Sequence, residues 1–87
     1  SLTDNAPLRR LIARYATEER IAWVAAEHRK GRRLYVGTTD LDVRRAVFWD
    51  MGEIASRGTP ESRELFRDVL LASSAIPGFF PPVPIRV

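Results

Sequence analysis

The stretch Leu34-Tyr35-Val36-Gly37-Thr38-Thr39 constrains the fold most, because the period of the sequence changes there. The residues before it place apolar side chains at helical spacing, whereas this stretch is a short, nearly unbroken run of strand formers. Such a run is typical of a strand buried on both faces of a sheet, as in α/β proteins. The chain is therefore expected to combine helices with a sheet.

Two helices are predicted before this strand. Asp4 and Asn5 can cap the first, Pro7 suits its first turn, and one apolar face follows at helical spacing. Thr17 can cap the second, and Gly31 is a natural stop for it. The expected inner faces are Leu8, Leu11, Ile12 and Tyr15 in the first helix, and Ile21, Val24, Ala25 and His28 in the second.

A second strand is expected at 46–49, with residues 42–45 as the turn after the first strand. Residues 51–57 could form a short helical turn, closed by Gly58. Thr59, Pro60 and Glu61 then have the pattern of a helix start. The inner face of this helix is expected to contain Leu65, Phe66, Val69 and Leu70.

The end of this helix is apolar nearly all round, which predicts deep burial. Pro77-Gly78 stops it, and the prolines of Phe79-Phe80-Pro81-Pro82 exclude regular helix and a central strand. Residues 83–87 are strand-like. The predicted fold class is α/β, α+β within this chain, in the order α-α-β-β-α-β.

Composition limits the chemistry. With 87 residues the chain forms one domain at most, and its core is modest. The absence of cysteine excludes disulfides, thiolate zinc sites and cysteine nucleophiles, and the single histidine excludes a histidine-based metal cluster. No signal-peptide pattern or run long enough for a membrane span occurs. Because residue 1 is Ser and not Met, the sequence is expected to be a segment of something longer.

Positive charge is concentrated near the N-terminus. The net charge is +3, and all but one of the 14 basic residues are arginine. Residues 1–33 carry 8 basic and 4 acidic residues, whereas residues 34–87 carry 6 and 7. This charge is too small to argue for nucleic acid without a motif, so no nucleic-acid partner is expected.

Several polar residues have both a structural and a functional interpretation. His28 lies near a helix C-terminus, where a protonated ring is favoured; a catalytic role is the alternative. Asp40 and Asp42 follow a strand, where functional groups are common, but the turn-forming role is favoured. Two carboxylates alone do not make a metal site.

The basic run 29–33 could bind phosphate or an anionic membrane, or simply be a solvated helix end, which is favoured. Ser73 and Ser74 have no base or glycine elbow beside them, so close packing is the favoured interpretation. Phe79 and Phe80 could line an apolar pocket or fill the core.

Two stretches together resemble the patatin-like phospholipase family. Leu34-Tyr35-Val36-Gly37-Thr38-Thr39-Asp40-Leu41 is similar to its strand ending in "TDL". Residues 70–83, Leu-Leu-Ala-Ser-Ser-Ala-Ile-Pro-Gly-Phe-Phe-Pro-Pro-Val, are similar to its "ASxAxPxxFPP" segment. The second match is the more specific, because the small residues, Pro77 and the Phe-Pro-Pro turn keep the family's spacing.

The resemblance implies a three-layer α/β/α hydrolase fold with a Ser–Asp dyad. In the family, the serine of G-x-S-x-G precedes the "TDL" strand, and the aspartate of D-G-G or D-G-A follows the Phe-Pro-Pro segment. Neither motif occurs in this sequence, so no catalytic residue is assigned. The implied parent would hydrolyse acyl esters of lipids without a cofactor. Phe79 and Phe80 are the candidates for lining its acyl pocket.

Two functional hypotheses follow. In the first, the chain is an inner segment of a patatin-like lipid acyl hydrolase, inactive alone and without esterase activity on short acyl esters. In the second, it is a self-standing basic α+β module that binds an anionic partner. The first also predicts a homo-oligomer, because a piece of a larger sheet leaves strand edges and apolar faces uncovered.

Overall fold

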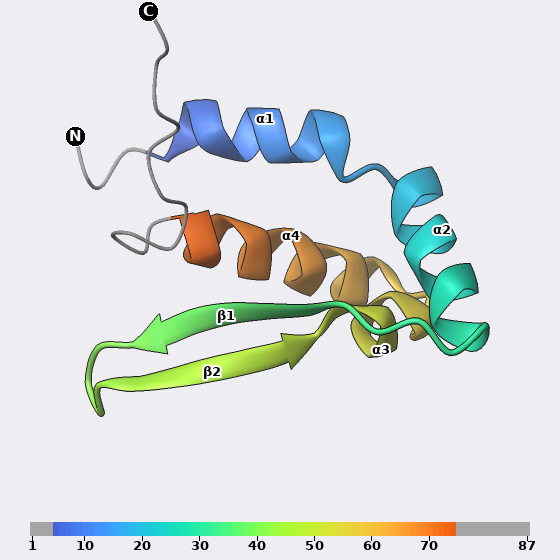
Figure 1. The fold of residues 1–87 in the computed structure, drawn as a ribbon. Helices are drawn as coiled ribbons and strands as arrows, with labels where there is room; N and C mark the ends of the chain where they lie inside the picture. Colours follow the sequence, from blue (N-terminus) through green and yellow to red (C-terminus); the bar gives the residue numbers. More distant parts are fainter. Residues whose placement is uncertain (1–4, 75–87) are drawn as a thin grey trace, which may run out of the picture.

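The chain combines helices with one β-hairpin, and α4 lies along one side of that hairpin (Figure 1). The computed structural model describes residues 5–74. Its elements, in chain order, are α1 (Ala6–Tyr15), α2 (Glu18–Arg29), β1 (Tyr35–Asp40), β2 (Arg45–Asp50), α3 (Met51–Ser56) and α4 (Pro60–Ser74). The mixed α+β class is confirmed. The order is α-α-β-β-α-α, because the turn expected at 51–57 is a short helix and the strand predicted at 83–87 lies outside the described residues.

β1 and β2 pair antiparallel, with Tyr35 opposite Asp50 and Asp40 opposite Arg45. The loop at 41–44 contains Arg44 at a φ of 53°, the left-handed conformation that closes such a turn. Asp40 Oδ1 accepts hydrogen bonds from the backbone N–H groups of Asp42, at 3.0 Å, and Val43, at 3.4 Å. The turn-forming interpretation of Asp40 is therefore confirmed.

The expectation that the strand at 34–39 is buried on both faces is wrong for the part of the chain that the structure describes. Of β1, only Gly37 is buried, and Tyr35 is 58% exposed. Within residues 5–74 the sheet has two strands, and α4 is the one helix that packs extensively against it (Figure 1). One covering helix on a hairpin leaves the other face open.

The core lies where α2, α3 and α4 meet. Ile21, Met51 and Ile54 are its largest fully buried side chains, and Phe66 and Val69 close it from α4. The predicted inner faces of α2 and α4 are confirmed, since Val24, Leu65 and Leu70 pack against this cluster. The close contact between α2 and α3 brings the end of α2 to the start of α3.

Local capping explains the element boundaries. Thr17 Oγ1 accepts from the N–H of Arg20 at 3.2 Å and begins α2, and Gly31, with φ 99°, ends it. At α4, Thr59 Oγ1 accepts from the N–H of Ser62 at 3.0 Å, and Ser62 Oγ accepts from the N–H of Thr59 at 3.1 Å. These two reciprocal bonds form a capping box.

The first helix departs from expectation. Asn5 occupies the N-cap position of α1, but its side chain makes no capping hydrogen bond. α1 lies along α4 (Figure 1), with Ile12 against the core. Leu11 and Tyr15 stay 47% and 61% exposed. The predicted apolar face is thus only partly buried, because α4 is the only helix in residues 5–74 that packs extensively against α1.

The end of α4 is also less buried than predicted. Ser73 is 2% exposed, whereas Ala72 and Ser74 are exposed. Within the described residues, the last turn of α4 therefore buries one side and not the whole circumference. In the same part of the chain, no helix is long and apolar enough to span a membrane.

Candidate functional site

His28 lies in the last turn of α2, where that helix meets α3. Its Nδ1 is 3.8 Å from Asp50 Oδ1 and 3.3 Å from Arg33 Nη1. Nδ1 of the ring thus lies between the guanidinium of Arg33 and the carboxylate of Asp50. Asp50 also caps α3, since its Oδ1 accepts from the N–H of Glu53 at 3.1 Å. The imidazole therefore belongs to a polar junction between two helices.

The junction has no partner suited to covalent catalysis among the described residues. Within residues 5–74 no serine or threonine hydroxyl shares a hydrogen bond with His28. A His-activated nucleophile requires a hydroxyl within hydrogen-bond reach of the ring. The geometry therefore favours the structural interpretation of His28.

Ser73 and Ser74 bond to the backbone of their own helix. Ser73 Oγ donates to the carbonyl of Leu70 at 2.9 Å, and Ser74 Oγ donates to the carbonyl of Leu71 at 2.7 Å. Neither hydroxyl approaches a base in the described part of the chain. The burial of Ser73 agrees with the packing interpretation.

Asp40 is the last residue of β1 and Asp42 lies in the hairpin loop, and the structure does not bring them to His28. Nor does it show a group of three or more histidine or acidic residues suited to a metal within residues 5–74. These two carboxylates therefore remain turn residues in this structure.

The basic run at 29–33 divides into two parts. Lys30 Nζ and Arg32 Nε both approach Glu27 Oε2, at 3.8 and 3.6 Å. Arg33 instead turns back, and its Nη1 donates to the carbonyls of His28, at 3.1 Å, and Arg32, at 2.9 Å. Arg32 and Arg33 border a hollow of about 210 Å³, whose lining also includes Trp23, Leu34 and Gly52.

Two residues of this region were not selected from the sequence. Trp23 is not on the predicted inner face of α2, and the helical pattern gave no reason to single it out. In the structure it is 61% exposed. Gly52 touches the ring of His28, and a Cβ built on it would overlap that ring. The only signal for Gly52 was its place within a predicted helical turn, where glycine is unfavourable unless a close approach requires it.

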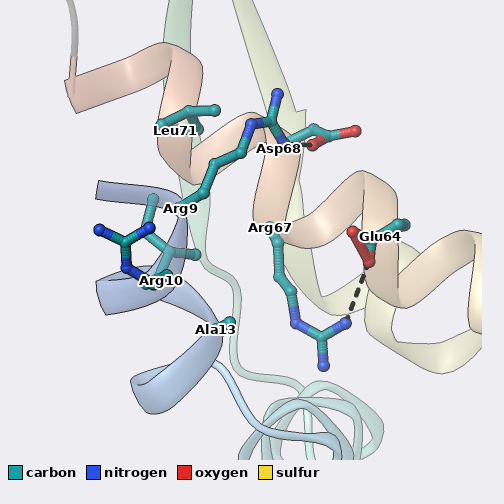
Figure 2. A pocket seen from close by; sticks show the side chains of 8 residues that line it. Arg9, Arg10, Ala13, Glu64, Arg67, Asp68 and Leu71 are labelled. Atoms are coloured by element: carbon teal, nitrogen blue, oxygen red, sulfur yellow. Dashed lines mark hydrogen bonds and ion pairs between the residues drawn. The ribbon is translucent and has the colours of Figure 1, made fainter. Parts of the chain in front are cut away.

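A second hollow, of about 290 Å³, lies between α1 and α4 (Figure 2). Arg9 reaches across from α1 to Asp68, with Nη1 to Oδ1 at 3.2 Å. Arg67 is paired with Glu64 at 3.2 Å, and its Nε donates to the carbonyl of Ala16 at 2.8 Å. Two of the arginines here thus hold the helices together, which leaves little net charge for a ligand.

The comparison with family models decides the relationship of this chain. The model of the family described as patatin-like phospholipase matches residues 1–87. The chain belongs to the patatin-like phospholipase family. No curated protein and no solved structure matches it.

The two motifs that resemble the patatin-like family occupy different parts of this fold. The segment 34–41 contains β1 and the first residue of the hairpin loop, and residues 70–74 form the end of α4. The remainder of the second motif, including Phe79 and Phe80, lies outside the described residues. Membership of the patatin-like family makes the chain part of a lipid-related hydrolase family.

Proposed function

We propose that this chain is an inner part of a patatin-like lipid acyl hydrolase whose catalytic serine and aspartate lie outside these 87 residues. The observation that carries the proposal is the family match over residues 1–87. The sequence contains neither G-x-S-x-G nor D-G-G, which hold the two catalytic residues in the family it resembles. The dyad must therefore come from elsewhere if the chemistry is that of the family.

In the proposed hydrolase, the serine attacks the acyl carbonyl of a lipid ester and the aspartate takes the serine proton. Backbone amides hold the oxyanion, the bond to the alcohol part of the lipid breaks, and that alcohol leaves with the proton from the aspartate. Water, which gives a proton to the aspartate, then attacks the acyl-serine ester, and the fatty acid leaves as the serine hydroxyl regains that proton. The role of this segment is architectural: its hairpin and α4 contribute to the three-layer α/β/α sheet domain. Phe79 and Phe80 are proposed to line the acyl pocket, since rigid apolar side chains suit an alkyl chain.

The chain alone is proposed to be inactive. His28 has no nucleophile beside it in residues 5–74, and Ser62, Ser73 and Ser74 use their hydroxyls on backbone carbonyls. Without a nucleophile and an oxyanion site, acyl transfer has no route.

Hydrolysis of short-chain nitrophenyl esters tests this proposal. The protein in its natural length should hydrolyse them, whereas the 87-residue chain should give only the rate of the buffer. Phe79→Ala and Phe80→Ala in the natural-length protein should change the preference for acyl length, with Leu11→Ala as a control. Turnover by the 87-residue chain that one substitution abolishes would overturn the proposal.

The chain by itself is also proposed to form a homo-oligomer. Within residues 5–74, each strand of the hairpin has one edge without a partner strand. Phe48 and Val47 on β2 are 71% and 37% exposed. Open edges beside exposed apolar residues favour pairing with another copy.

A further inference from the structure

One face of the molecule combines exposed aromatic side chains with arginines. It is built from the end of α1, one side of α2 and the loop between α2 and β1. We call it the α2 face, and define it by Arg14, Tyr15, Arg20, Trp23, Val24, Arg32, Arg33 and Leu34.

Three hollows make the α2 face continuous. The first is the hollow at His28. The second, of about 280 Å³, is distinct from the hollow between α1 and α4, and it shares Val24 and Leu34 with the hollow at His28. A third hollow shares Trp23 with the first and Arg20 with the second. These shared residues join the three hollows into one surface.

The centre of the α2 face is apolar and open. Tyr15 and Trp23 are each 61% exposed, and Leu34 is 48% exposed. A single exposed apolar residue needs no explanation, but several side by side mark an interaction surface. Tyrosine and tryptophan join an apolar ring to a polar tip, which suits a boundary between water and an apolar phase.

The rim of the α2 face is cationic. Among the residues at 5–74, no carboxylate lies within ion-pair distance of Arg14, Arg20 or Arg33. Arg20 Nη1 donates to the carbonyl of Tyr15 at 2.9 Å, and its guanidinium lies 5.7 Å from the centre of that ring. The lining of the three hollows contains four arginines and two glutamates, Glu19 and Glu27, so its net charge is positive.

We propose that the α2 face docks on the surface of an anionic lipid membrane. Its aromatic residues would enter the level of the lipid head groups, and its arginines would bind the head-group phosphates. Acidic lipids attract basic residues that lie close to the membrane. The inference rests on the proposed lipid hydrolase, for which this face would bring the enzyme to its substrate.

The charge of the rim argues against a second copy of the chain as the occupant. Two α2 faces in contact would bring arginines against arginines, and like charges opposed across an interface are unfavourable. A lipid surface supplies both an apolar layer and negative charge, so it satisfies the centre and the rim together.

Vesicle flotation of the natural-length protein tests the inference. Binding should be strong to phosphatidylcholine mixed with phosphatidylglycerol and weak to phosphatidylcholine alone. Arg32→Glu/Arg33→Glu should reduce the affinity for the mixed vesicles by roughly tenfold or more. Arg44→Glu/Arg45→Glu, in the hairpin, makes the same change of net charge on another surface and should have a much smaller effect.

Insertion of Trp23 is a second measurement. Brominated phosphatidylcholine in the mixed vesicles should quench tryptophan fluorescence, and Trp23→Phe should remove most of that quenching. Trp49→Phe should leave it, because Trp49 is half-buried and donates from Nε1 to Thr38 Oγ1 at 2.9 Å.

Each outcome separates the two proposals. Hydrolysis of soluble short-chain esters without vesicle binding would overturn the docking inference and leave the proposed function standing. Vesicle binding that depends on Arg32, Arg33 and Trp23, without ester hydrolysis, would overturn the proposed function and leave the docking of the α2 face standing. Equal loss of binding in both double variants, or a dimer that buries Trp23, would also overturn the α2 face as a membrane surface.

Discussion

Gly52 lies directly against the imidazole of His28, so closely that a Cβ on Gly52 would overlap the ring. This contact allows α2 and α3 to approach each other and brings Nδ1 of the ring to 3.8 Å from Asp50 Oδ1. Gly52 is buried at the second position of a six-residue helix. The absence of a side chain there is therefore a packing requirement of the junction.

Gly52→Ala is expected to lower the free energy of unfolding by about 1–3 kcal/mol, the usual cost of overpacking a closed site. Urea denaturation of the two proteins measures the difference. In a His28→Ala background the same substitution should become neutral or stabilising, because the ring is gone and alanine favours the helix. Equal effects in both backgrounds would show that the two residues are not coupled.

Local patterns predicted most helices of this fold. Thr17 and Thr59 cap the helices they were expected to cap, and Gly31 ends α2 in the left-handed conformation. Such features depend on a few neighbouring residues, so the sequence carries them directly. The side chain of Asn5 does not cap α1, although its residue type is suitable, because capping also depends on local geometry.

Long-range contacts were harder to predict. The composition of β1 indicates a strand but does not say how many layers cover it, and Tyr35 remains 58% exposed. The His28–Asp50 pair joins residues from α2 and the end of β2, which no spacing in the sequence relates. Of the α2 face, the sequence analysis noted only the basic run at 29–33.

Arg67 is expected to stabilise the fold more than Arg9. Arg67 Nε donates to the carbonyl of the buried residue Ala16, at 2.8 Å, and ties the α1–α2 connection to α4. Arg67→Met should cost about 1–3 kcal/mol, because it leaves that carbonyl without this donor. The Arg9–Asp68 pair is about half exposed on both sides, so Arg9→Met should cost at most about 0.5 kcal/mol.

Thermal unfolding of Arg67→Met and Arg9→Met under one buffer condition compares these costs. Both arginines border the hollow between α1 and α4 (Figure 2), and both substitutions remove one charge. Equal changes in the two variants would contradict a special role for the bond to Ala16.

Glu53 is expected to make stability depend on pH in the acid range. The hydrogen bond from Arg57, with Nη2 to Oε2 at 2.8 Å, holds the pKa of Glu53 below its ordinary value of about 4.5. A lowered pKa in the folded state adds stability above the unfolded pKa, and this is lost as pH falls through the folded pKa. Wild type should therefore exceed Glu53→Gln in stability at neutral pH and converge with it below the folded pKa.

Urea denaturation of both proteins across this range measures the difference. The effect should be small and should decrease with added salt, because the pair is exposed. A gap between the two proteins that stays constant at acid pH would assign the effect of Glu53 to something other than its charge.

Self-association of the 87-residue chain is expected to depend on the hairpin. Phe48 is 71% exposed on β2, and within residues 5–74 the outer edge of that strand has no partner. Phe48→Lys adds a charge at this edge, a device by which natural proteins prevent strand pairing between molecules. Sedimentation velocity should show an oligomer for the wild-type chain and a shift toward monomer for this variant. Leu11→Lys makes a comparable change on α1, where the residue is 47% exposed, and should leave the oligomer intact. A wild-type chain that stays monomeric and folded at all concentrations would contradict the proposed oligomer, since its open edge would then need no partner.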